Sequence, residues 1–144
     1  MWRDLDEKEI QFSNFLDLLI SNFSLRRIAY LQYEGGWEDY YLVADAEPAD
    51  YRVDFTVYKE GEKIANVVVE ADTGKAEVEY YNLNSQEIRD LERFTELIKD
   101  YLKQVGFTLN QTAFKFESKD EDLLWLEKES EVKNEKNQVI KIKL

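Results

Sequence analysis

Residues 51–81 decide the fold, and they read YRVDFTVYKEGEKIANVVVEADTGKAEVEYY. From Tyr51 to Tyr58, apolar and polar residues alternate one by one, which is the period of a β-strand with one buried face. Two turn segments and two further strand patterns follow: the turns are Lys59–Lys63 and Asp72–Lys75, and the strands are Ile64–Ala71 and Ala76–Tyr81. The stretch therefore predicts three antiparallel strands joined by tight turns.

The apolar positions also predict how these strands pair, because a slip of one residue would turn every side chain to the wrong face. The predicted pairs are Val57–Ala65, Phe55–Val67, Val53–Val69 and Tyr51–Ala71 in the first hairpin and, with Thr73-Gly74 at the tip of the second turn, Ala71–Ala76, Val69–Val78 and Val67–Tyr80. One face of the three strands is then apolar. The opposite face carries two cross-strand rows, which are Arg52, Glu70 and Glu77, and then Asp54, Val68 and Glu79.

Two helices are predicted on either side of this region. Asn84 and Glu87 have the spacing of a capping box, apolar residues follow at helical steps, and Gly106 stands where a helix would end. This pattern predicts a long helix near residues 85–105. Apolar residues at three- and four-residue steps predict a first helix from Asp4 to Phe23, with a second capping-box spacing at its start.

Further strands complete the predicted sheet. Arg26–Tyr33 and Trp37–Ala44 are rich in β-branched and aromatic residues, and Glu34-Gly35-Gly36 between them predicts a hairpin turn. The only proline lies in Asp45–Asp50, which we interpret as a loop. Near the end of the chain, Thr112–Glu117 alternates like a strand, and Gln138–Leu144 is predicted to be a terminal strand that completes the sheet. The segment Asp122–Lys128 between them fits either a short helix or a strand.

These elements predict the α+β class: an antiparallel sheet of about five to seven strands, built from hairpins and a meander, with both helices packed on one face. With 144 residues, 44% of them apolar, the chain is long enough for one domain spanning residues 1–144. Neither a targeting segment nor a membrane-spanning run of apolar residues is visible, so we expect a soluble, cytoplasmic protein.

Composition narrows the possible functions. The net charge of −12 opposes binding to nucleic acids and to anionic membranes, and it favours a basic protein partner. The chain has no cysteine and no histidine, which removes thiolate chemistry and the commonest general base and metal ligand. We therefore expect a binding role rather than catalysis, and no cofactor.

A candidate partner-binding segment runs from Glu34 to Asp50. Aromatic rings anchor protein interfaces, and acidic side chains steer a basic partner toward them. This segment combines both kinds of residue and contains no basic one; the candidate residues are Glu34, Trp37, Glu38, Asp39, Tyr40, Tyr41, Asp45, Glu47 and Asp50. The alternative is that its rings belong to the core and its acids to the solvated side of a hairpin.

The acidic face of the central strands offers a different possibility. Asp54, Glu70, Glu77 and Glu79 could hold Mg²⁺ or Ca²⁺, which prefer several oxygen ligands. The order Val53-Asp54-Phe55, turn, Val69-Glu70-Ala71-Asp72 resembles the acid-strand-acid core of the PD-(D/E)XK nuclease superfamily over about twenty residues. That resemblance implies a metal-dependent nuclease or phosphodiesterase using Asp54, Glu70 and Glu77. The family has a lysine two positions after the second acid, where this chain has Asp72, so the site implied is a degenerate one.

Our leading hypothesis is an acidic binding module that occupies a basic partner surface, such as a toxin-immunity protein or a phage-type inhibitor. The metal-dependent enzyme is one alternative. A structural subunit that forms a homodimer through a sheet edge or exposed aromatic residues is another.

Overall fold

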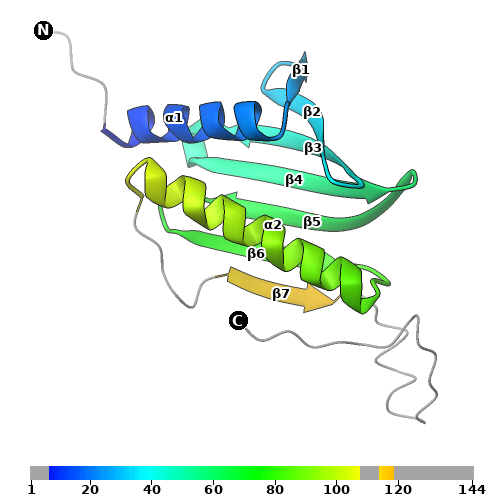
Figure 1. The fold of residues 1–144 in the computed structure, drawn as a ribbon. Coiled ribbons are helices and arrows are strands. Elements are labelled where there is room, and N and C mark those ends of the chain that lie inside the picture. The colour runs from blue at the N-terminus through cyan, green and yellow to red at the C-terminus, as the bar shows by residue number, and fades with distance from the viewer. Residues whose placement is uncertain (1–6, 108–113, 119–144) are drawn as a thin grey trace, which may run out of the picture.

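In the part of the chain that the structure describes, seven strands form one sheet in the order in which they occur along the chain, and two helices pack on the same face of it (Figure 1). The computed structural model describes residues 7–107 and 114–118. Its elements are α1 (Glu7–Asn22), β1 (Arg26–Ala29), β2 (Gln32–Trp37), β3 (Tyr40–Glu47), the 3₁₀ turn η1 (Pro48–Asp50), β4 (Arg52–Lys59), β5 (Glu62–Glu70), β6 (Lys75–Tyr80), α2 (Ser85–Gln104) and β7 (Phe114–Ser118). The predicted α+β class is confirmed.

Neighbouring strands are antiparallel from β1 to β6, whereas β7 runs parallel to β6 after the chain has crossed the sheet through α2. Between β4 and β5 the predicted register is confirmed, since Val57 pairs with Ala65 and Val53 with Val69. The connecting turn, Glu60-Gly61, has positive φ at both residues, which is the geometry that best matches the twist of a two-residue hairpin.

Between β5 and β6 the predicted register is wrong by two residues. Val69 pairs with Ala76 instead of Val78, because the loop from Ala71 to Gly74 has four residues and is closed by a 3.2 Å bond from the Gly74 amide to the Ala71 carbonyl. An even shift keeps every side chain on its predicted face. The rows on the other face do change: Lys75, and not Glu77, lies opposite Glu70, and the remaining pairs are Val68–Glu77 and Asn66–Glu79.

The predicted turn at Glu34-Gly35-Gly36 is also wrong. Both glycines lie inside β2, and the chain reverses two residues later, at Glu38-Asp39, where Glu38 has a φ of 57°. A Cβ atom on Gly35 would lie 2.6 Å from a methyl group of Leu25 and from the Phe23 carbonyl oxygen. Gly35 is therefore required for the close approach of the α1–β1 connection, and it does not mark a turn. The first hairpin also moves, since β1 and β2 are joined at Tyr30-Leu31.

Helix α2 begins and ends close to the predicted positions. The Asn84 side chain accepts a 2.8 Å bond from the Glu87 amide, and the Glu87 carboxylate accepts a 3.0 Å bond from the Asn84 amide, so the predicted capping box is confirmed. Gly106 follows the helix with a φ of 99°, a conformation that glycine adopts without steric cost. The buried face of α2 consists of Ile88, Leu91, Phe94, Thr95, Ile98, Tyr101 and Leu102.

The core lies between the helices and the apolar face of the sheet. Phe23, at the end of α1, packs its ring against Phe55 of β4 and Phe94 of α2, with centroids 6.4 and 5.3 Å away. Leu18 and Ile20 are partly buried against the same core, so the apolar face of α1 is broader than a single stripe. Full burial of side chains of this size contributes about 1.5–3 kcal/mol each.

Four further predictions concern other segments of the chain. Asp45–Asp50 is wrong as a loop, because β3 continues to Glu47 and η1 covers the rest. The strand predicted at Thr112–Glu117 corresponds to β7 in its described part. The segments Asp122–Lys128 and Gln138–Leu144 lie outside the described residues. Within the described part of the chain, neither helix is long and apolar enough to cross a membrane.

Candidate functional site

The sheet face turned away from α1 and α2 is not covered by any element that the structure describes. We call this surface the open face. Strand pairing and alternation assign to it Glu34 from β2; Tyr41, Val43, Asp45 and Glu47 from β3; Arg52, Asp54, Thr56 and Tyr58 from β4; Lys63, Asn66, Val68 and Glu70 from β5; Lys75, Glu77 and Glu79 from β6; Tyr81 just after it; and Glu117 from β7.

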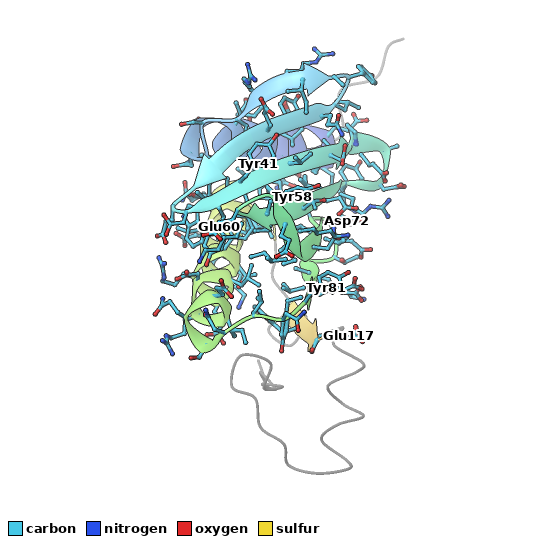
Figure 2. The ribbon with its side chains drawn as sticks, turned by 90° about the vertical axis from the view of Figure 1, so that its right-hand side faces the viewer. Tyr41, Tyr58, Glu60, Asp72, Tyr81 and Glu117 are labelled. Atoms are coloured by element: carbon cyan, nitrogen blue, oxygen red, sulfur yellow. The ribbon has the colours of Figure 1, made fainter. Side chains whose placement is uncertain are left out.

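Three tyrosines line one end of the open face, and we call them the tyrosine row. Tyr41 and Tyr58 are direct partners on β3 and β4, with ring centroids 5.7 Å apart. Lys63 lies opposite Tyr58 on β5, and its ammonium group stands 5.7 Å from the centre of the Tyr81 ring. Figure 2 shows Tyr41, Tyr58, Tyr81 and Glu117 following one another across the sheet. Tyr41 is 44% exposed although it is a large aromatic residue.

Smaller side chains occupy the centre of the open face. Val43, Thr56 and Asn66 pair across β3, β4 and β5, and Val68 lies next to Asn66 along β5 on the same face. Asn66 donates to the Phe55 carbonyl at 3.1 Å and to the Asp54 carboxylate at 3.3 Å. All four are only half-buried. The centre is thus low in profile and carries no charge.

The next row contains carboxylates in an unfavourable arrangement. Asp45 and Asp54 are direct cross-strand partners, and like charges in this position are destabilising. Burial raises the pKa of Asp54 above its ordinary value; Arg52 opposes this rise, and Asp45 and Glu47 add to it. Gln32 donates to Asp45 at 2.9 Å, which satisfies one oxygen without supplying a positive charge.

Basic side chains on and beside the open face are paired with its carboxylates. Arg52 forms an ion pair with Glu47, and its buried Nε has no hydrogen-bond partner among the described residues. At the β1 side, Glu34 accepts hydrogen bonds from Tyr41 and Arg26, and these lower the pKa of Glu34. Carboxylates outnumber basic groups on the open face as a whole, so its electrostatic potential is negative.

The structure divides the predicted partner-binding residues among three places. Glu34, Tyr41, Asp45 and Glu47 lie together on the open face. Asp39, in the β2–β3 turn, and Asp50, in η1, are exposed and make no hydrogen bond or ion pair with another described residue. The remaining predicted residues are Trp37, Glu38 and Tyr40, which contact α2 instead.

These contacts attach the β2–β3 hairpin to α2. Trp37 lies between the Phe94 ring, at 5.4 Å, and the Arg93 guanidinium, at 5.1 Å, and it stacks on Tyr40. Tyr40 is 5% exposed and donates to Asp90 at 2.6 Å. We call Trp37, Glu38, Tyr40, Asp90 and Arg93 the hairpin clamp. The Tyr40 ring belongs to the core and the partly buried Trp37 ring packs against it, so both rings are engaged within the protein.

Two ionic contacts complete the hairpin clamp. Arg93 binds both carboxylate oxygens of Glu38, at 2.7 and 2.9 Å, which lowers the pKa of Glu38. Burial disfavours the charged form of Asp90, but hydrogen bonds from Tyr40, Arg93 and Gln86 outweigh this effect and lower its pKa. Burial and the bond to Asp90 raise the pKa of Tyr40.

The residues of the metal alternative share the open face but do not converge. Asp54 and Glu77 lie on either side of Val68, while Glu70 lies between Arg52 and Lys75. Among residues 7–107 and 114–118, no group of three or more acidic side chains is arranged to hold a metal ion. The metal-dependent enzyme therefore remains a prediction without structural support.

The site also contains residues that the partner-binding prediction missed. Tyr58, Tyr81 and three of the small central residues lie outside the Glu34–Asp50 segment, and only the pairing of strands brings them beside Tyr41 and Val43. A usable signal existed, because the alternation of β4 already placed Tyr58 on the polar face. No family model, curated protein or solved structure matches this chain.

Proposed function

We propose that this protein is an acidic binding module whose open face occupies a basic surface of a partner protein. One observation carries the proposal: a complete sheet face, free of any described helix, combines exposed and half-buried tyrosines with an excess of carboxylates. Interfaces use aromatic rings as anchors and charged residues around them for steering and specificity. A toxin-neutralising immunity protein or a phage-type inhibitor would act in this way.

The pairing of Asp45 with Asp54 supports the same proposal. A solvated face has no need for two carboxylates in direct opposition, and their repulsion costs stability in the free protein. A lysine or arginine of a partner, placed near both, would remove that cost on binding. Interfaces in which positive and negative surfaces meet gain association rate and specificity from such arrangements.

Affinity capture from the native host, with matched charge reversals, tests the proposal. The open-face variant carries Asp45→Lys and Asp54→Lys, and the control carries Glu92→Lys and Glu96→Lys on the outer side of α2. Both variants change the net charge equally. We expect a basic protein to be retained by the wild type and by the control but lost from the open-face variant.

Two outcomes would contradict the proposal. Equal loss from both variants would mean that overall charge, and no particular surface, retains the captured proteins. Equal retention by all three proteins would mean that the open face is not the binding surface. Glu38 is unsuitable for such a reversal because it is bound to Arg93 in the hairpin clamp.

A further inference from the structure

The shape and charge of the open face restrict what can lie on it. Resting on the proposed function, we propose that its occupant is an amphipathic α-helix of the partner, with a basic polar side. The inference depends on three features: the low centre of the face, the tyrosine row at one end, and the carboxylates at the other.

The low centre has the width of one helix. Val43, Thr56 and Asn66 lie on three adjacent strands, and strands are about 4.8 Å apart, so this row spans roughly 10 Å. An α-helix with its side chains is about 10–12 Å across. A single helix over β3, β4 and β5 would therefore cover the uncharged centre and leave the carboxylates of β6 and β7 beside it.

A helix whose width covers β3, β4 and β5 lies parallel to the strands, so the two ends of this surface lie under its two halves. Along β3 and β4, the tyrosine row lies on one side of the centre and the Asp45–Asp54 pair on the other. Apolar side chains in one half of the helix would contact the Tyr41 and Tyr58 rings and Val43. Lysine or arginine side chains at the flank of the other half would reach Asp45, Asp54 and Glu77.

Other occupants fit the open face less well. A second copy in a twofold dimer would place this surface against itself, so carboxylates would face carboxylates in a chain of charge −12. Nucleic acid is repelled by the same charge. An added strand binds through free backbone groups at a sheet edge, whereas β2 to β6 each have neighbours on both sides within the sheet.

Two synthetic peptides of equal composition test the inference directly. Both contain leucine and lysine over about 14 residues; one has leucines at helical spacing, and the other alternates leucine with lysine to favour a strand. Binding is measured by titration, and the contacted residues are mapped by backbone chemical-shift changes. We expect the helical peptide to bind at least about tenfold more tightly, with shifts concentrated at Val43, Thr56 and Asn66.

A matched pair of variants tests the position of the helix. Thr56→Trp raises the low centre and should weaken binding of the helical peptide by about tenfold or more, whereas Thr56→Ser keeps it low and should leave binding unchanged. The circular dichroism spectrum and thermal unfolding show whether each variant is folded. Should Thr56→Trp not fold, Val68→Lys makes the same test by placing a positive charge at the centre.

The possible failures are distinguishable. If both peptides bind the open face equally well, or if Thr56→Trp binds like the wild type, the helix inference is wrong while a basic partner for this face still stands. If neither peptide binds, or the shifts map to the outer side of α2, the inference fails and the proposed function loses its support as well.

Discussion

Gly35 fixes the distance between the end of α1 and the second strand. Its missing side chain leaves room for Leu25 and for the backbone at Phe23, which a Cβ atom would approach to 2.6 Å. Real Cβ atoms do not come this close to backbone oxygen atoms, so a larger residue must displace the connection. The glycine contributes to stability through this close packing.

We expect Gly35→Ala to destabilise the protein by about 1–3 kcal/mol, as overpacking of a tight site does. Gly36→Ala is the matched control, because its Cβ atom would meet nothing closer than 3.4 Å. Urea unfolding of both variants measures the difference. Equal losses of unfolding free energy in the two variants would show that the glycines affect stability only through the flexibility of the strand.

For the Asp45–Asp54 pair we expect a substitution to stabilise the protein. Because the folded state raises the pKa of Asp54, its charged form is less stable there than in the unfolded chain. The unfavourable effect is fully present at neutral pH and disappears as the pH falls and Asp54 becomes protonated. Asp54→Asn removes the charge while keeping the shape of the side chain.

We therefore expect Asp54→Asn to raise the free energy of unfolding at pH 7 by about 0.5 kcal/mol, the scale of one cross-strand pair. The gain should shrink toward pH 4. Glu70→Gln serves as the control, because Glu70 lies opposite Arg52 and Lys75 and its removal should not stabilise. A loss of stability in Asp54→Asn would show that Asp54 is a structural residue.

At the scale of elements, the hairpin clamp links β2 and β3 to α2. Its acidic members, Glu38 and Asp90, both have pKa values below their ordinary values in the folded protein. Lowered carboxylate pKa values stabilise the fold above the unfolded pKa, near 4, and this contribution is lost as the pH falls through the folded pKa. The attachment of the hairpin should therefore weaken in acid.

Arg93→Met tests this dependence by removing the group that holds both carboxylates. We expect its melting temperature to lie below that of the wild type at pH 7, with the difference shrinking toward pH 3. Arg89→Met carries the same charge change on the same helix but breaks only a bond to Gln86, so its difference should not vary in this way. If the difference in melting temperature between Arg93→Met and the wild type did not change with pH, Arg93 would stabilise the hairpin by packing on Trp37 and not through the ionised carboxylates.

The accuracy of the sequence predictions varied with how local the determining interactions are. The β4–β5 hairpin and the start of α2 depend on alternation, a turn glycine and a capping pair within a few residues, and they were predicted correctly. Gly35-Gly36 was misread because its role depends on Leu25, a contact that the local sequence does not show. The actual turn, Glu38-Asp39, lacks the glycine that marks the favoured two-residue hairpin turns.

The sequence predicted the candidate site only where its residues depend on local patterns. Once the turn moves to Glu38-Asp39, Trp37 and Tyr40 become direct partners on the buried face, and the predicted surface anchors enter the core. Tyr41 stays outside because it is one residue further along. The tyrosine row joins Tyr41 of β3, Tyr58 of β4 and Tyr81 just after β6, so it follows from the pairing of strands and not from any one segment.

Across the molecule, every described strand pairs with the next described strand along the chain. Chains with such local contacts lose little conformational entropy in forming each successive pair, and they fold quickly. Among the described strands, β7 alone pairs in parallel with its predecessor, and this pairing requires the intervening α2 crossover.

Because of this late, parallel pairing, we expect β7 to open more readily than the rest of the sheet. Among the described strands, β7 lies at an edge with β6 as its neighbour, so it can detach while β1 to β6 remain paired, and its amide hydrogens should exchange with solvent through partial opening. We expect the exchange of β7 amides to require a smaller opening free energy than that of β4 and β5, which exchange only when the whole protein unfolds. Mass spectrometry after timed deuterium labelling measures both. Identical protection would mean that α2 and β7 open only together with the entire sheet, as a single cooperative unit.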